Sequence, residues 1–213
     1  MTRAARRNTL FVLVLLVFGA IAGFGGYYAG GRADALHHAR FLHRKADELL
    51  AQGRDGPGLG PGREAMLLAV ESPSSGTIPT LTRSLARRFA FDPSEDSLAW
   101  IRHSGYASGL DTALTDPQIV ALWLETVEMG KGPDGWMTGF YQTSEAVYGR
   151  MQSQLTDEEF LRLLAVVAAP SRFDLQGRDP ALEARVARLR RLVAGLCRSA
   201  GKGDVWLRRC TAD

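Results

Sequence analysis

The chain has 213 residues, of which 46% are hydrophobic and 23% charged, so it is long enough for one medium-sized domain. No internal repeat or low-complexity tract argues for another organisation. The net charge of +3 and pI near 9.1 are too mild for a nucleic-acid-binding protein, which needs a dense basic stripe. We therefore expect an anionic surface or a small anionic ligand as partner, and no nucleic acid.

Segment 10–31 predicts a transmembrane anchor. It carries no charge and has about the 20 residues that a membrane-spanning helix needs. Three arginines precede it and place residues 1–9 in the cytoplasm, although basic residues also follow the span. A cleaved signal peptide is the alternative, because Ala33-Asp34-Ala35 resembles a processing site. Since the apolar run exceeds the core of roughly 7 to 15 residues that signal peptides have, we favour a retained anchor.

The segment 32–63 predicts a juxtamembrane helix followed by a linker. Its first part has apolar residues at steps of three and four, the period of an amphipathic helix: Leu36, Ala39, Leu42, Ala46 and Leu49. The opposite side is basic and rich in histidine, which suits either lipid headgroups or solvent. Its histidines lack the spacing of metal ligands. The stretch "GRDGPGLGPGR" from Gly53 is predicted to be a flexible linker from its composition.

Residues 64–213 predict a single all-α domain. Asp-Pro pairs and a capping box mark four helix starts, at Asp92-Pro93, Asp116-Pro117, Thr156 to Glu159, and Asp179-Pro180. Suitable helix stops are Gly130, Gly149 and Pro170. No alternating run of β-branched residues predicts a strand. We expect one core around the aromatic residues Trp100, Trp123, Phe140, Tyr148 and Phe160.

The two cysteines, Cys197 and Cys210, are spaced so that a disulfide would close a short C-terminal loop. Such a bridge would place the domain outside the cytosol. In the chain-entropy model it is worth about 3 kcal/mol, because it constrains the unfolded chain. Two unrelated buried thiols are the alternative.

Two neighbouring segments could carry chemistry. Glu71 ends the apolar run "AMLLAV" at the edge of a loop, where a glutamate can be partly desolvated, although an ordinary surface glutamate is the simpler interpretation. At the next helix start, Thr80 and Thr82 supply hydroxyls near free backbone N–H groups. Arg83 and Arg87 share a face there and can fork onto phosphate oxygens. A diphosphate suits this helix, and a solvated basic face is the alternative.

Five segments, in this order, resemble the peptidoglycan glycosyltransferases of glycosyltransferase family 51, the lipid II polymerases. They are "TLTRSLARR" from Thr80, "DPQIVALWLE" from Asp116, "GPDGWMTGFYQTSEAVYGR" from Gly132, "LTDEEFLRLLAVVAAPSRFDL" from Leu155 and "ALEARVARLRRLV" from Ala181. The resemblance covers roughly Glu64 to Val193. The order and spacing of the parts are more specific than any one part.

The resemblance implies a lysozyme-like helical domain on the periplasmic side of the inner membrane, behind a single-pass anchor. It implies lipid II, a disaccharide-pentapeptide on a polyprenyl diphosphate, or the nascent glycan strand as ligand. It also allows other cell-wall synthases as partners and a divalent cation as cofactor. Glu71 matches the family's general base, which deprotonates the acceptor sugar hydroxyl. The segment that matches the lining of the diphosphate site holds Thr80, Thr82, Arg83 and Arg87.

The sequence departs from the family pattern at chemical positions. After Glu71 it reads "SPSSGTIP", without the aspartate, phenylalanine and histidine of the family motif, and the join Ser72 to Pro79 is shorter. Where the family has R-K-x-x-E, only Arg102 could partly replace the cation pair. We therefore predict a degenerate glycosyltransferase, weakly active or a pseudoenzyme. The alternative is a non-catalytic periplasmic scaffold that binds lipid II, glycan or a synthase.

Overall fold

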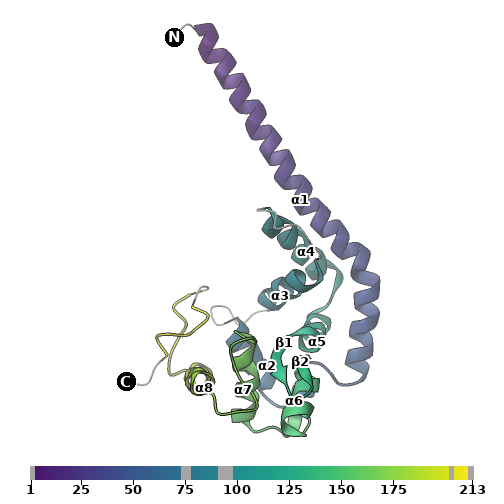
Figure 1. Cartoon of the computed structure of the whole chain (residues 1–213). Helices are drawn as coiled ribbons and strands as arrows, with labels where there is room; N and C mark the ends of the chain where they lie inside the picture. Colours follow the sequence, from purple (N-terminus) through teal and green to yellow (C-terminus); the bar gives the residue numbers. More distant parts are fainter. Residues whose placement is uncertain (1–2, 73–77, 91–97, 202–203, 211–213) are drawn as a thin grey trace. The chain divides into compact units, whose positions relative to one another are not determined.

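The structure is a computed structural model that describes residues 3–72, 78–90, 98–201 and 204–210. These residues are mostly helical, as the sequence predicts (Figure 1). The chain divides into two compact units, residues 1–40 with 86–113, and residues 41–85 with 114–213.

The helices and strands of the described residues are α1 (Arg3–Ala51), the 3-10 helix η1 (Pro57–Leu59), α2 (Arg63–Glu71), α3 (Pro79–Phe89), α4 (Ala99–Ala113), α5 (Asp116–Thr126), β1 (Glu128–Gly132), β2 (Gly135–Thr138), α6 (Phe140–Tyr148), the 3-10 helix η2 (Gln152–Gln154), α7 (Asp157–Val167) and α8 (Pro180–Val193).

Helix α1 is continuous through the predicted span and the predicted juxtamembrane helix, so no break separates segments 10–31 and 32–51. It contains an apolar stretch long enough to cross a membrane. The apolar side of the juxtamembrane part is buried at Ala39, Leu42, Ala46 and Leu49, whereas Leu36 is exposed. The amphipathic pattern is thus confirmed at four of its five positions.

In the first unit, α4 packs closely against α1 because glycines lie at the contact. A Cβ atom on Gly105 would overlap the backbone carbonyl of Tyr28, and one on Gly109 would overlap the side chain of Ala35. These glycines are four residues apart and lie on the same side of α4, a spacing that lets helix backbones approach closely. Polar contacts flank this packing, including a hydrogen bond of 3.0 Å between His38 Nδ1 and the Tyr106 hydroxyl.

In the second unit, the core forms around aromatic side chains of α5, α6 and α7. Trp123, Phe140 and Phe160 are fully buried, and the rings of Phe140 and Phe160 meet edge to face with centroids 5.4 Å apart. Tyr148 is half-buried. The prediction was wrong for Trp100, which is 65% exposed in the first turn of α4.

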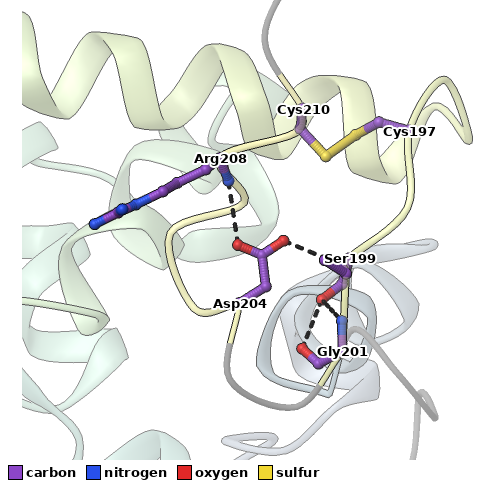
Figure 2. Close-up of a disulfide and its surroundings, with 7 residues drawn as sticks. Cys197, Ser199, Gly201, Asp204, Arg208 and Cys210 are labelled. Carbon is purple, nitrogen blue, oxygen red and sulfur yellow. Dashed lines mark hydrogen bonds between the residues drawn. A yellow bond between two sulfur atoms is a disulfide. The ribbon is translucent and has the colours of Figure 1, made fainter.

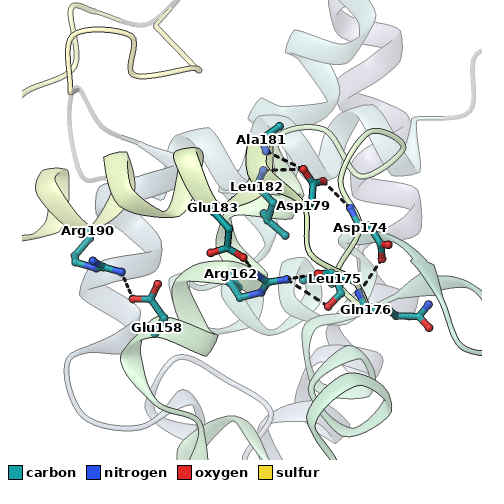
Figure 3. Close-up of polar contacts among 11 residues, drawn as sticks. Glu158, Arg162, Asp174, Leu175, Gln176, Asp179, Ala181, Leu182, Glu183 and Arg190 are labelled. Carbon is teal, nitrogen blue, oxygen red and sulfur yellow. Dashed lines mark hydrogen bonds and ion pairs between the residues drawn. The ribbon is translucent and has the colours of Figure 1, made fainter. Parts of the chain in front are cut away.

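The predicted helix ends are partly confirmed. Thr156 forms the capping box with Glu159, and Asp179 caps α8 by accepting from the N–H groups of Ala181 (2.9 Å) and Leu182 (3.1 Å; Figure 3). Gly149 ends α6 in the left-handed conformation. Helix α5 starts at Asp116 but its N-cap is Thr115. The predicted start Asp92-Pro93 lies outside the described residues.

A β-hairpin, which the sequence analysis did not predict, separates α5 from α6. Strands β1 and β2 pair antiparallel across the turn Pro133-Asp134, with a register irregularity between Glu128 and Gly130. Gly130 was predicted to stop a helix but lies in β1 instead. Its φ of +83° and the Pro170 carbonyl, which a Cβ atom would overlap, both require glycine.

The glycine-rich stretch 53–63 is packed into turns, where composition alone predicted a flexible linker. The backbone N–H of Gly58 donates to Asp55 Oδ1 (2.8 Å), and the Tyr141 hydroxyl donates to the Asp55 carbonyl (2.9 Å). The buried Arg63 side chain donates to the carbonyls of Leu59 (3.2 Å), Gln152 and Leu155. A single guanidinium therefore joins the start of α2 to the η2 region.

Candidate functional site

Glu71, the predicted general base, is the last residue of α2 and is half-buried. Helix α2 packs against α8, and the Glu71 carboxylate lies within electrostatic range of the Arg185 guanidinium. Arg185 is buried, and this burial lowers its pKa to about 10, with Arg188 adding to the decrease and Glu71 opposing it. Glu71, the candidate base, therefore interacts electrostatically with the buried cation Arg185.

Arg185 is fixed by contacts with three parts of the chain. Its Nε donates to the Ala165 carbonyl of α7 (3.0 Å), and its Nη1 donates to the Val205 carbonyl (2.8 Å). Its guanidinium lies 5.5 Å from the ring centroid of Trp206. The C-terminal segment is therefore connected through this arginine to the surroundings of Glu71.

The sequence analysis did not select Arg185, although a signal was present. Arg185 falls on the apolar stripe of α8 that includes Leu182, Val186 and Leu189, all of which are buried. An arginine at such a position must bring its hydrogen-bond partners into the core, because an unpaired buried charge is costly. Its position within the helical period was the feature that distinguished it from the neighbouring arginines.

Helix α3 carries the four residues that were predicted to contact a diphosphate. Thr80 is half-buried, whereas Thr82 is fully buried and lies 3.5 Å from the Ile78 carbonyl that its hydroxyl contacts. Arg83 and Arg87 are exposed, and Arg83 Nε donates to the Pro79 carbonyl (3.1 Å). The two arginines are thus the accessible cations among these four residues.

The predicted join between Glu71 and α3 is only partly described, because residues 73–77 lie outside the described residues. The predicted length effect of the segment Ser72 to Pro79 therefore stays a prediction. Arg102, which was predicted to replace part of a family cation pair, forms an ion pair with Asp34 of α1 at 2.7 Å between Nη2 and Oδ2, and its predicted role stays a prediction. Both side chains are about 40% exposed (39% and 42%), so the pair is accessible to water.

The predicted disulfide is present between Cys197 and Cys210, whose Cα atoms are 5.4 Å apart (Figure 2). Inside the loop, Asp204 accepts from the backbone N–H groups of Ala200 (3.0 Å) and Arg208 (3.2 Å). These hydrogen bonds lower the pKa of Asp204, since they favour its ionised form. The bridge and this carboxylate together fix the segment that contacts Arg185.

Among the described residues, no group of three or more His, Cys, Asp or Glu side chains is placed to hold a metal ion. The described part of the chain therefore supplies no ready site for the divalent cation that the resemblance allows. A substrate diphosphate could itself contribute oxygen ligands, so we assign no protein residue to a cation.

Most of the domain that contains these residues matches a known protein family. The model described as Transglycosylase matches residues 65–194, which is more than half of the chain. The chain belongs to the transglycosylase family. Comparison with curated proteins found no match. The transglycosylase match includes Glu71, α3, Arg102 and Arg185, whereas the disulfide and Trp206 lie beyond its end.

Membership fits the mostly helical architecture and the long apolar helix that precedes the transglycosylase domain. Lipid II and the glycan strand are the ligands that this family implies in general terms. The disulfide is consistent with a location outside the cytosol.

Proposed function

We propose that this transglycosylase-family protein is anchored in the inner membrane and binds lipid II or the nascent glycan strand on the periplasmic side, with weak or no polymerase activity. The observation that carries the proposal is the ion pair between Arg102 and Asp34. Arg102 is the residue in the aligned region that could partly replace the family's cation pair, and its charge is already compensated. A transferring glycosyl group needs cations on the leaving diphosphate, and each lost donor typically costs orders of magnitude in rate.

The surroundings of Glu71 support the same proposal. A general base must accept a proton from the acceptor hydroxyl in the transition state. The Glu71 carboxylate interacts electrostatically with the buried Arg185 guanidinium, so a fixed positive charge lies near the candidate base. The family's aspartate, phenylalanine and histidine after the glutamate are also missing from the sequence "ESPSSGTIP". Arg83 and Arg87 support binding, because both are exposed and guanidinium groups can form paired hydrogen bonds with phosphate oxygens.

A retained anchor is supported by the packing around the suggested cleavage site. Ala35 is fully buried and lies against Gly109, and its neighbour Asp34 pairs with Arg102. Cleavage after Ala35 would remove Asp34 and Ala35 from this helix pair. The mass of the protein extracted from membranes tests this point, since a signal peptide would leave a chain about 35 residues shorter.

The activity test uses the full chain in detergent with labelled lipid II, and gel analysis of the glycan product. We expect at most trace polymer, and loss of any trace in Glu71→Gln but not in Glu145→Gln, an exposed glutamate of α6. Polymer formation at a rate of about 1 per second or more, within the usual range for enzymes, would refute the proposal of weak activity.

The binding test separates a scaffold from an orphaned domain. Retention of lipid II on the immobilised protein should survive Glu71→Gln and fall about tenfold or more in the double variant Arg83→Ala, Arg87→Ala. Arg150→Ala is the control, because this arginine pairs with Glu159 on a different part of the domain. Absence of retention by the wild-type protein would contradict the binding proposal.

A further inference from the structure

A cavity lies where α8 meets the disulfide-closed segment. Its volume is about 310 Å³, and its lining residues are Arg172, Phe173, Ala181, Ala184, Arg188 and Trp206. The size corresponds to the lower end of small-ligand sites. Trp206 lies beyond residue 194, where the transglycosylase match ends. The cavity is therefore completed by a part of the chain that the family match does not cover.

Positive charge is concentrated around this cavity. The guanidinium of Arg172 lies 5.7 Å from the Trp206 ring centroid, and that of Arg185 lies 5.5 Å from it. Arg188 is close enough to Arg185 to disfavour its charge, whereas Glu71, which does not line the cavity, compensates part of the charge of Arg185. No acidic residue lines the cavity among the described residues. Because like charges repel, this cluster favours an anion beside it.

Some arginines of α7 and α8 form ion pairs with glutamates, whereas others have a buried N–H without a hydrogen-bond partner in the described part of the chain. Arg190 pairs with Glu158 and Arg162 pairs with Glu183 (Figure 3). In contrast, the Nε atoms of Arg188 and Arg191 are buried and have no hydrogen-bond partner within the described part of the chain; of these two residues, Arg188 lines the cavity. A buried donor without a partner costs about 1–3 kcal/mol, so a rotation of the Arg188 side chain that offers this N–H to an acceptor in the cavity is favoured.

We propose that this cavity binds an oxyanion, a phosphate or carboxylate group, through Arg188 and Arg172. Guanidinium groups match such anions because their N–H donors lie in one plane and can form two parallel hydrogen bonds. Ala181 and Ala184 leave space at the wall, while Phe173 and Trp206, whose rings meet edge to face with centroids 6.2 Å apart, form its aromatic side. The proposal does not depend on polymerase activity.

The test is calorimetric titration of the full chain, in nonionic detergent with its disulfide intact, with inorganic phosphate and separately with glutarate. Arg188→Gln should weaken binding of the preferred probe about tenfold, the loss expected for one charge-assisted hydrogen-bond pair. The control Arg190→Gln removes the same charge from the same helix but lies outside the cavity, so its affinity should change less than about twofold.

The two probes distinguish the sources of the anion. Tighter binding of phosphate assigns the site to phosphate groups, and tighter binding of glutarate assigns it to carboxylates; either result supports the proposal if Arg188→Gln reduces it. Arg172→Gln is a second variant in case Arg188→Gln lowers the melting temperature. Equal losses in Arg188→Gln and Arg190→Gln, or no saturable binding of either probe, would overturn the proposal.

Discussion

Replacing Arg185 by methionine should destabilise the domain and release its C-terminal segment. The change leaves the carbonyl of Ala165 without its donor in a buried position, at about 1–3 kcal/mol, and removes the donor to the part-buried carbonyl of Val205, which water can partly replace. Relief from burying a guanidinium offsets part of this loss, as the lowered pKa of Arg185 indicates. We expect a net loss of about 2 kcal/mol in the free energy of unfolding.

The assay is equilibrium unfolding of the detergent-solubilised protein, followed by tryptophan fluorescence, since Trp206 contacts Arg185. Arg185→Lys is the matched variant; it keeps the charge but not the forked donors, so it should lose less than Arg185→Met. Combining Arg185→Met with Glu71→Gln should give a non-additive result of at least about 0.5 kcal/mol, because the two residues interact. Wild-type stability in Arg185→Met, or strict additivity with Glu71→Gln, would refute this reasoning.

Three further predictions concern stability. Cys197→Ala with Cys210→Ala should lower the free energy of unfolding by about 3 kcal/mol, and reductant should have little further effect on that variant in thermal unfolding. Burial and, secondarily, the Asp34 charge raise the pKa of Tyr106 to about 12. The contribution of the neutral Tyr106 hydroxyl to the free energy of unfolding is therefore complete below pH 10 and is lost as pH rises through about 12. Tyr106→Phe should therefore flatten the fall of the melting temperature between about pH 10 and pH 12; an unchanged slope would contradict this. Arg63→Met should cost about 3 kcal/mol in chemical denaturation, since three carbonyls lose their donor, and a loss below about 1 kcal/mol would show that water replaces it.

Features set by local chemistry could be predicted from the sequence. The capping box at Thr156, the Asp179 cap and the Gly149 stop depend on a few neighbouring residues, and the structure confirms all three. The Cys197–Cys210 disulfide likewise joins residues that are close in sequence, and it closes a short loop. The family assignment followed from the order of several such segments.

The hairpin was missed for an identifiable reason. Its strands contain glycine, lysine and methionine in place of alternating β-branched residues, so hydrophobic periodicity gives no strand signal. The sequence Gly132-Pro133-Asp134-Gly135 nevertheless has turn chemistry, with proline fixing φ and glycine following. Reading this turn first would have predicted two short strands around it.

The candidate site could be predicted only in part, because its contacts are long-range. Sequence comparison selected Glu71 but not its neighbour Arg185, which lies 114 residues later on another helix. The ion pair of Arg102 could not be predicted either, since its partner Asp34 lies 68 residues earlier, on α1. Burial is a property of the whole fold, so the half-buried Thr80 and the fully buried Thr82 look alike in sequence.

The close packing of α4 on α1 has a practical consequence for producing this protein. The apolar part of α1 is an obvious segment to remove when this chain is shortened for expression. A chain that began after residue 40 would lack Tyr28, Gly31 and Ala35, leaving the glycine face of α4 exposed to water. We expect such a shortened chain to aggregate, or its α4 to unfold. Functional assays on it would then report on a chain without the native packing of α4.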